Sequence, residues 1–467
     1  MFRIGAQRVP PKTLLMAASD GLFIVLGLLF ATWLRFLSDH GTFRHNLWTH
    51  ETLWRFALVV LVCELSLYYN DLYSSEVIHR HELLFVRMMQ ALGVSCVSLA
   101  FLYYLDPNLS LGRGIAALAA PLILTMTLGW RILVNKTGLL FRRPERVLIL
   151  GTSPAGIELV REIIKRPELH LKVVGFLDER GENIGKSLVN PGIIGGVNDV
   201  ESVVDREKID HVVLALAERR GCTPAKQLLH LKFSGIQVDD AHSYYERVTG
   251  RILLERLSPS WLILSEGFNK SKILISAKRA IDIGVSLFLL ILFAPAMAAT
   301  ALAVWLESGS PVLFRQTRVG LEGKPFEVLK FRSMTQDAES DGKPRWAVAG
   351  DHRITRVGGF IRKCRLDELP QLINVLRGEM SLVGPRPERP HFCELLEQQI
   401  PFFGQRHAVR PGITGWAQVK YAYGSTVEDA KAKLELDLFY IKNLSIMLDL
   451  AIIFETAKVM LLQRGAK

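Results

Sequence analysis

Acidic and basic side chains near the C-terminal end of the 467-residue chain stand at spacings suited to phosphate chemistry. Lys330 and Arg332 are separated by one residue, Arg362 follows in a second basic run, and Asp367 and Glu368 are adjacent carboxylates. Such a density of cations beside an acidic pair suits a site that binds several phosphates. A solvated basic face on a membrane surface is the other interpretation, and spacing alone favours neither.

The acidic pair also stands where a helix is expected to begin. Asp367 can cap a helix whose first turn holds Pro370 and whose end is marked by Gly378. Backbone N–H groups at such a helix start favour carboxylates and phosphates alike. Glu368 points in a different direction from Asp367, so the two acids can take different roles. Helix starts often carry acids, however, so the pair alone does not establish catalysis.

Glycine and proline shape two rigid turns after the acidic pair. The segment 380–387 contains Gly-Pro-Arg-Pro, which aims Arg386 in a fixed direction. The segment 410–419 begins with Arg-Pro-Gly and continues through Ile-Thr-Gly-Trp. Either turn on its own would be ordinary loop chemistry.

The elements that must position these residues begin with an upstream α/β section. A buried-strand pattern at 147–150 is followed by a glycine turn, an amphipathic run and further strand patterns at 173–178 and 211–216. This order predicts a Rossmann-like domain. The dinucleotide fingerprint is incomplete, because Ser153 replaces its middle glycine, although Asp178 could bind a ribose. We therefore favour a turn that packs helix on strand over a cofactor site.

The N-terminal third is dominated by apolar segments, which cover residues 13–34, 56–70, 88–105 and 114–130. They predict a four-helix transmembrane bundle. Glu64 would be costly facing lipid, so we expect its carboxylate to turn into the bundle; a lipid-headgroup or proton site is the alternative. Lys and Arg residues before the first helix and after the fourth predict that both ends of the bundle are cytoplasmic.

A fifth apolar stretch, 283–306, has no charged residue, yet positive residues flank it on both sides. Pro295 lies at its centre, where a proline kinks a helix. These features predict a re-entrant helix that enters and leaves the membrane by the cytoplasmic face. The tail pattern at 446–462 predicts an amphipathic helix that can lie at the interface.

Composition agrees with a mixed membrane and aqueous protein: 49% of residues are hydrophobic and 22% charged. The net charge of +11 does not indicate a nucleic-acid partner, because the basic residues flank apolar segments and form no single stripe. The five cysteines are scattered and contain no Cys-x-x-Cys pair, which argues against a zinc site.

The C-terminal motifs resemble those of the bacterial sugar transferases, the polyprenyl-phosphate glycosyl-1-phosphate transferases. The resemblance begins near residue 271 and is carried by Lys-Phe-Arg-Ser-Met at 330–334, Asp-Glu-Leu-Pro-Gln at 367–371, Asn-Val-Leu at 374–376, and the segments 380–387, 411–416 and 435–440. It implies three parts: a four-helix transmembrane bundle at 1–140, a Rossmann-like cytoplasmic domain at 146–267, and a re-entrant helix with a small α/β catalytic domain at 271–467. Every catalytic motif lies in the last part, so we expect the Rossmann-like section to be dispensable for chemistry.

The resemblance also implies the reaction and its participants. A hexose-1-phosphate passes from a UDP-sugar to polyprenyl (undecaprenyl) phosphate with release of UMP, the initiating step of exopolysaccharide or O-antigen synthesis. Asp367 matches the nucleophile that forms a covalent phosphosugar intermediate. Glu368 matches the ligand of Mg²⁺. Lys330, Arg332, Arg362 and Arg386 match phosphate-binding positions. The enzyme is expected in the bacterial inner membrane with its catalytic domain on the cytoplasmic face, and a homodimer is compatible with this layout.

Two other functions compete with this one. A membrane-anchored NAD-dependent nucleotide-sugar dehydratase or epimerase would use the Rossmann-like section, but no Tyr-x-x-x-Lys pair evidently follows its glycine turn. A non-enzymatic export scaffold would not need the complete set of C-terminal motifs. A bound nicotinamide would favour the first of these, and UMP release would exclude the second.

Overall fold

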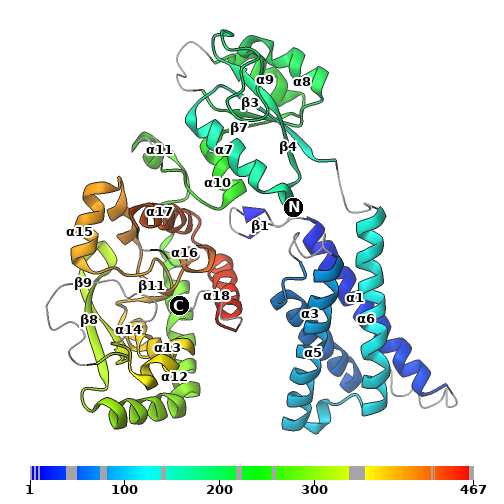
Figure 1. The fold of residues 1–467 in the computed structure, drawn as a ribbon, viewed down its shortest axis with the longest axis vertical. Helices are drawn as coiled ribbons and strands as arrows, with labels where there is room; N and C mark the ends of the chain where they lie inside the picture. The colour runs from blue at the N-terminus through cyan, green and yellow to red at the C-terminus, as the bar shows by residue number, and fades with distance from the viewer. Residues whose placement is uncertain are drawn as a thin grey trace.

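The computed structural model describes residues 3–4, 7–8, 11–37, 50–73, 81–137, 143–216, 223–254, 259–335, 353–421, 424 and 426–461. Figure 1 shows three parts: a bundle of long helices, a small α/β domain, and a larger C-terminal domain. A two-stranded antiparallel pair, β1 (Arg3–Ile4) and β2 (Gln7–Arg8), precedes the bundle. The predicted boundary near residue 140 lies outside the described residues.

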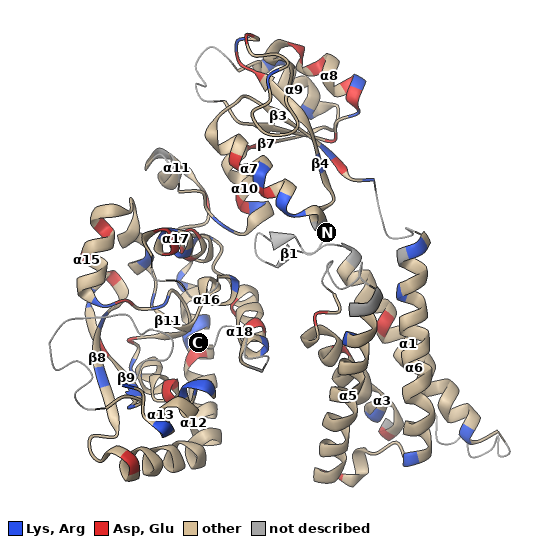
Figure 2. Cartoon of the chain, viewed as in Figure 1, with Lys and Arg blue, Asp and Glu red and all other residues tan. Residues whose placement is uncertain are grey.

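The bundle consists of α1 (Pro11–Arg35), α3 (His50–Tyr69), α5 (His81–Leu105) and α6 (Arg113–Thr137), with the short η1 (Pro107–Leu109) before α6. Its core is almost entirely aliphatic and includes Ile24, Leu28 and Leu84. Figure 2 shows that charges are sparse on these helices and frequent on the α/β domain. Each of the four helices is long and apolar enough to cross a membrane, as predicted, and so is α12 (Lys272–Ser308) of the C-terminal domain.

Ionisable side chains inside the bundle face one another. Arg131 of α6 pairs with Asp20 of α1 and also donates to the Leu72 carbonyl at 2.5 Å. Glu64 of α3 accepts from the Tyr73 hydroxyl at 2.7 Å. The expectation that Glu64 turns into the bundle is therefore confirmed, and its interior contacts avoid exposing a carboxylate to lipid.

The α/β domain is built on a five-stranded parallel sheet of order β5-β4-β3-β6-β7, which confirms the Rossmann-like prediction. The strands are β3 (Glu145–Leu150), β4 (Leu171–Asp178), β5 (Ile193–Gly196), β6 (His211–Leu214) and β7 (Gln237–Asp240). The helices are α7 (Pro154–Lys165), η2 (Pro167–Leu169), η3 (Val197–Asp199), α8 (Val200–Glu207), α9 (Ala225–Phe233) and α10 (Ala241–Thr249).

The glycine turn of this domain packs against the neighbouring strand. Gly151 has a φ of +104°, and a Cβ placed on it would lie 2.4 Å from the Ala215 carbonyl oxygen. A Cβ on Gly156 would lie 2.6 Å from the Ala215 Cβ. The Asp178 carboxylate accepts from the backbone N–H of Glu182 at 3.0 Å, within its own loop. These contacts favour the packing interpretation of the turn over a dinucleotide site.

The C-terminal domain contains α11 (Pro259–Leu264), α12, α13 (Arg356–Lys363), α14 (Gln371–Arg377), α15 (Pro390–Gln399), α16 (Trp416–Lys420), α17 (Val427–Lys442) and α18 (Ile446–Leu461). Its strands β8 (Leu313–Val319) and β9 (Pro325–Phe331) form a hairpin, and β10 (Ser381–Val383) pairs in parallel with β11 (Gly412–Thr414). The 3-10 segments are η4 (Leu321–Gly323), η5 (Leu366–Glu368) and η6 (Phe403–Ala408). The core surrounds α17, whose second half is buried on all sides.

The predicted fifth apolar segment lies within α12, a single helix of 37 residues that contains Pro295. Figure 1 shows α12 changing direction part-way along, as an internal proline causes. Before the proline, Val285 and Leu289 pack against the main core. After it, Val304 packs with Phe331 of β9 and with α13. The return of this helix to the same membrane face remains a prediction.

A packed segment joins the α/β domain to the C-terminal domain. Ile252 and Leu254 are buried in the C-terminal core, although they precede the predicted boundary at 267–271. The Trp416 indole donates to the Gly250 carbonyl at 3.0 Å, and Glu246 of α10 pairs with Lys442 of α17 at 2.7 Å. The C-terminal core therefore draws on residues that sequence alone assigned to the upstream domain.

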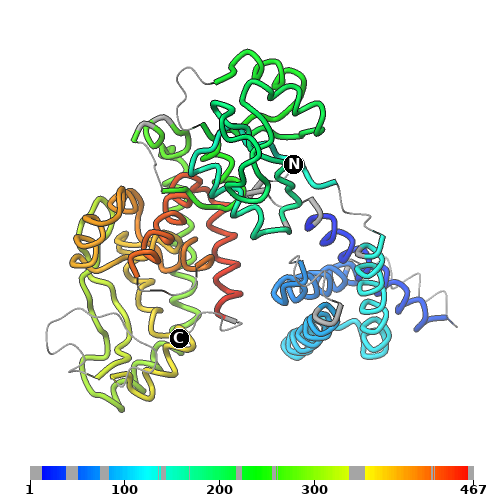
Figure 3. Tube along the Cα trace, turned by 45° about the horizontal axis from the view of Figure 1, so that its top comes forward, coloured from blue at the N-terminus to red at the C-terminus, as the bar shows by residue number. Residues whose placement is uncertain are grey.

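The bundle also contacts the C-terminal domain through α18. The Tyr68 hydroxyl donates to Glu455 at 2.7 Å, and Lys458 pairs with Asp71 at 2.5 Å. Figures 1 and 3 both show α18 on the side of the C-terminal domain that is nearest the bundle. A helix over the tail segment predicted at 446–462 is thus confirmed, and its polar residues contact the end of α3 and the residues just after it; its placement at the membrane interface remains a prediction.

Candidate active site

The acidic pair lies in the 3-10 turn η5, between α13 and α14. Arg365, directly before the turn, has a left-handed backbone with a φ of +58°, a conformation that costs a non-glycine residue about 1–2 kcal/mol. The N-cap of α14 is Pro370, so the expectation that Asp367 caps this helix is wrong. The predicted end at Gly378 is correct, since that glycine has a φ of +85°. The tight turn leaves Asp367 free of a capping role.

Glu368 is held between two cations. Its Oε1 lies 3.0 Å from the Lys330 Nζ of β9 and 3.0 Å from an Arg386 guanidinium nitrogen in the turn after β10. Burial acts to raise the pKa of Glu368, but the charges of Lys330 and Arg386 outweigh it and hold the pKa below its ordinary value. This carboxylate is therefore ionised at neutral pH.

Asp367 differs from its neighbour in its contacts. It is 8% exposed, and its Oδ1 has no hydrogen-bond partner among the described residues. Burial and the adjacent Glu368 raise its pKa, while Lys330, Arg362 and Arg365 act in the opposite direction. An unpartnered oxygen on a desolvated carboxylate beside cations is suited to nucleophilic attack on phosphorus.

Asn374 fixes the strand that carries Lys330 against the helix that follows the acidic pair. Its side-chain oxygen accepts from the Leu329 N–H at 3.0 Å, and its side-chain nitrogen donates to the Glu327 carbonyl at 2.7 Å. Both partners are in β9, and Asn374 itself is fully buried. The distance between Lys330 and Glu368 is thus set by a rigid connection.

Of the other two predicted phosphate-binding residues, Arg332 contacts the end of α12 and Arg362 lies near Asp367. Arg332 is 7% exposed and donates at 2.6 Å to the carbonyls of Ser308 and Gly309, at the end of α12. Its Nη2 therefore stabilises a helix end instead of contacting the acidic pair, and a phosphate-binding role for Arg332 remains a prediction. Arg362 stands in the last turn of α13, half-buried and close enough to lower the pKa of Asp367.

Comparison with known proteins shows the family of the chain. Residues 273–463 match the family model described as bacterial sugar transferase, and residues 69–223 match one described as CoA-binding domain. A UDP-glucose:undecaprenyl-phosphate glucose-1-phosphate transferase of Klebsiella pneumoniae is 36% identical over 337 residues, which cover 70% of each chain. The chain belongs to the bacterial sugar transferase family.

Two further relatives match a smaller share of their own length. An undecaprenyl-phosphate glucose phosphotransferase of Komagataeibacter xylinus is 34% identical over 340 residues, 70% of this chain and 60% of the relative. A UDP-N-acetylgalactosamine-undecaprenyl-phosphate N-acetylgalactosaminephosphotransferase of Aeromonas hydrophila is 46% identical over 222 residues, 48% of this chain and 52% of the relative. The chain thus spans between about half and two thirds of the length of these two relatives.

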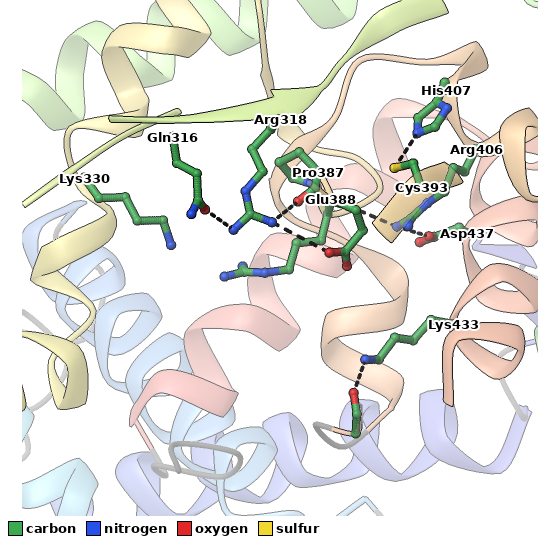
Figure 4. A network of polar contacts seen from close by, with 12 residues as sticks. Gln316, Arg318, Lys330, Pro387, Glu388, Cys393, Arg406, His407, Lys433 and Asp437 are labelled. Carbon is green, nitrogen blue, oxygen red and sulfur yellow. Dashed lines mark hydrogen bonds and ion pairs between the residues drawn. The ribbon is translucent and has the colours of Figure 1, made fainter. Parts of the chain in front are cut away.

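Two further arginines hold the backbone of the turn that carries Arg386. Arg318 of β8 donates to the Pro387 carbonyl at 3.0 Å, and Arg406 of η6 donates to the Arg386 carbonyl at 3.0 Å. Figure 4 shows Arg318, Arg406 and their partners Glu388 and Asp437 grouped around this turn. Asp437 could have been found from the resembling motif at 435–440, whereas nothing in the spacing of Arg318 or Arg406 singles them out.

The oxygen ligands at the site fit a magnesium ion. Mg²⁺ is usually bound by one or two carboxylates together with substrate phosphates. Glu368 offers an ionised carboxylate to such an ion, although its Oε1 also contacts Lys330 and Arg386. Within the described ranges, no three His, Cys, Asp or Glu side chains form a closed metal site. Water and the diphosphate of a substrate would complete the coordination of a metal held here.

Proposed function

We propose that this sugar transferase moves a hexose-1-phosphate from a UDP-sugar to undecaprenyl phosphate and releases UMP. The observation that carries the proposal is the buried acidic pair, in which Asp367 keeps an oxygen without a partner among the described residues while Glu368 is held by Lys330 and Arg386. The names of the Klebsiella and Komagataeibacter relatives describe transfer of glucose phosphate to undecaprenyl phosphate. The step would initiate synthesis of an exopolysaccharide or O-antigen.

The first half of the reaction uses Asp367. Its carboxylate oxygen attacks the sugar-linked phosphorus of the UDP-sugar, and a new O–P bond forms. The bond from that phosphorus to the bridging oxygen breaks, and UMP leaves with the electron pair. The product is an acyl phosphate that joins the sugar phosphate to Asp367.

The second half returns the enzyme to its starting state. A phosphate oxygen of undecaprenyl phosphate attacks the same phosphorus, and the bond to Asp367 breaks with the electron pair on the carboxylate. The lipid-linked sugar diphosphate leaves, and no proton or oxidant is consumed. Because phosphoryl transfer depends mainly on positioning and charge, Lys330 and Arg386 contribute by neutralising the phosphate oxygens.

Glu368 would hold Mg²⁺ at this site, as the family resemblance implies. When bound, the ion neutralises diphosphate charge and polarises the phosphoryl oxygen. Lys330 and Arg386, each 3.0 Å from Glu368, would neutralise the substrate phosphates beside it. Arg362 stands beside Asp367 and would favour the ionised carboxylate that attacks.

The membrane helices support a location in the bacterial inner membrane. With α12 entering and leaving by the cytoplasmic face, the acidic pair would lie at the headgroup level, where both cytoplasmic UDP-sugars and the lipid phosphate are available. A homodimer remains a prediction, which light scattering on the detergent-solubilised protein would test.

The proposal is tested by measuring UMP release from a panel of UDP-sugars in the presence of undecaprenyl phosphate. We expect release with at least one UDP-hexose and formation of an organic-extractable lipid-linked sugar. Absence of UMP with every UDP-sugar, from protein that remains folded in detergent, would overturn the proposal. Release of a free sugar phosphate without lipid product would show hydrolysis in place of transfer.

A further inference from the structure

A single turn of α12 holds the two segments on either side of the active site. Lys278 donates to the Val383 carbonyl at 3.0 Å and pairs with Asp449 of α18 at 2.6 Å. The next residue, Arg279, donates to the Val375 and Leu376 carbonyls at 2.6 and 2.9 Å. Those carbonyls end α14, and the acidic pair lies just before that helix. The sequence suggested only that these two cations flank a membrane segment.

The Val383 carbonyl is the centre of a buried polar cluster. The Tyr440 hydroxyl lies 3.0 Å from this carbonyl oxygen and 2.8 Å from the Asp449 Oδ1. The Ser381 hydroxyl also donates to the same carbonyl at 3.0 Å. Tyr440 is 1% exposed and Asp449 8% exposed, so the cluster is shielded from water. Burying these ionisable groups is costly unless they are paired, which favours a specific role for their geometry.

One helical turn further along α12, Asp282 makes a related contact. Its carboxylate accepts from the Leu382 N–H at 3.1 Å, and Asp282 is 4% exposed. Lys278 and Asp282 are four residues apart and therefore share a helix face. Asp282 binds the N–H of Leu382 and Lys278 binds the carbonyl of Val383, so the two side chains hold adjacent residues of β10. This face of α12 therefore holds β10.

The position of β10 controls the direction of Arg386. Val383 is followed by Gly384 and then by Pro385, whose ring fixes its backbone φ angle. The backbone between the held carbonyl and Arg386 is itself held, because the Gly384 N–H donates to the Thr414 carbonyl and the Pro385 carbonyl accepts from the Gly412 N–H, both at 2.9 Å. Since Arg279 holds α14 and Lys278 holds β10, the same turn of α12 fixes both partners of the Arg386–Glu368 contact.

We propose that Lys278, Tyr440 and Asp449 are positioning residues that set the Pro-Arg-Pro turn, and so Arg386, at the distance from Glu368 that UDP-sugar binding requires. This role rests on the proposed function. None of the three residues needs to touch the substrate. The membrane-inserted helix α12 is thereby coupled to the geometry of the catalytic site.

The test combines Tyr440→Phe with Arg386→Ala. Tyr440→Phe alone should lower kcat/KM for the UDP-sugar by roughly tenfold or more, mainly through KM, because a displaced Arg386 binds phosphate poorly. In the Arg386→Ala background the same change should have almost no further effect, since the side chain that it positions is gone. A double variant, Lys278→Met with Asp449→Leu, should recover much of the thermal stability lost by either single change, because no buried charge is left unpaired. Its kcat/KM should nevertheless stay low.

Lys442→Met is the matched control, because it removes a buried ion pair from the same helix as Tyr440 without touching β10. It should lower thermal stability and leave kcat/KM unchanged. Wild-type kcat/KM in Tyr440→Phe, or effects of Tyr440→Phe and Arg386→Ala that multiply independently, would overturn the positioning role. Absence of UMP release by the wild-type protein would instead reject the proposed function, so the two failures are distinct.

Discussion

Lys330 and Glu368 meet at 3.0 Å, although 38 residues separate them along the chain. The contact joins the end of the β8–β9 hairpin to the 3-10 turn before α14, and Asn374 locks the two elements together. Glu368 is thereby kept ionised, while one oxygen of the neighbouring Asp367 has no partner in the part of the chain that the structure describes. The two carboxylates are chemically distinct before any substrate binds.

This division predicts the behaviour of Asp367→Asn. The variant should remain folded, with a thermal midpoint equal to or slightly above that of the wild type, because a buried and incompletely paired carboxylate is replaced by a neutral amide. UMP release should fall by roughly 10³-fold or more, since an amide cannot form the acyl phosphate. The exposed residue Asp205 provides a control, and Asp205→Asn should keep full activity. Substantial UMP release by Asp367→Asn would reject Asp367 as the nucleophile.

Glu368→Gln should act through charge. The change removes the carboxylate that pairs with Lys330 and Arg386, and a magnesium ion would lose a charged ligand. We expect turnover to fall about 10²-fold and the Mg²⁺ concentration for half-maximal activity to rise. Activity is to be measured across a Mg²⁺ titration for both proteins. A wild-type enzyme that is insensitive to both EDTA and added Mg²⁺ would show that the metal assignment is wrong.

Asp437 predicts a specific pH dependence of stability. Burial raises the pKa of this carboxyl to about 6, although Arg406 opposes the shift. The folded chain therefore holds the proton more tightly than the unfolded chain, and this group's contribution to stability declines as pH rises from about 4 to 6. His407 acts in the opposite direction, since burial lowers its pKa to about 4. The two effects overlap in the wild type, so a variant is needed to separate them.

The measurement is chemical unfolding of the wild type and of Asp437→Asn in detergent from pH 4 to pH 7. The stability of the wild type relative to the variant should decrease across this range by on the order of 1–3 kcal/mol. The direction follows because Asn cannot titrate, whereas Asp437 loses its proton and becomes a buried charge. A difference that is constant with pH, or that grows as pH rises, would contradict the raised pKa.

The regular elements were largely predictable, because burial imposes a repeat on the sequence. The continuous apolar run at 147–150 lies in β3, and the apolar segments of the first third of the chain form the bundle helices. The packing of the glycine turn was also expected, and Gly151 and Gly156 do lie against Ala215; the lack of a cofactor there stays a prediction. These features depend on neighbours close in sequence, which is the range over which patterns are informative.

The details of the site were less predictable, because they depend on contacts between distant segments. Asp367 lies at a helix start, yet the left-handed backbone of Arg365 tightens the chain into a 3-10 turn and removes the capping role. Arg332 belongs to a motif rich in cations, but it binds the end of α12. Spacing also could not show that Lys278 reaches β10, since the two are more than 100 residues apart.

The packed segment before α11 predicts how a shortened chain behaves. A chain that begins at Asn269 lacks Ile252 and Leu254, which are buried in the C-terminal core, and each such loss costs about 1.5–3 kcal/mol. It should have a lower thermal midpoint than a chain that begins at Ala241, which keeps α10 and the Glu246–Lys442 pair. Both should release UMP while folded, because the acidic pair and its cations are intact. Inactivity of both chains in the folded state would show that the rest of the α/β domain takes part in the chemistry.

The internal proline of α12 predicts the topology of the C-terminal domain. A helix of 37 residues is longer than a bilayer requires, so length alone would allow a straight crossing. Such a crossing would place the acidic pair in the periplasm, away from cytoplasmic UDP-sugars. It would also place the basic residues after α12, beginning with Arg315, on the side that positive charge disfavours. A helix that turns at Pro295 and returns avoids both consequences, provided that packing or side chains satisfy the freed backbone groups.

Single cysteines in a cysteine-free background can measure this topology. Lys324→Cys places the thiol on an exposed side chain in the turn between β8 and β9, after α12 in the chain, and an impermeant maleimide in intact cells reports periplasmic exposure. We expect no labelling of Lys324→Cys until the cells are opened, whereas a cysteine at Asp106, between α5 and α6, should label directly if the bundle has four spans and cytoplasmic ends. Adding Pro295→Leu should restore an unbroken apolar helix and raise labelling at position 324. Strong labelling of Lys324→Cys in intact cells with Pro295 present would rule out the re-entrant helix.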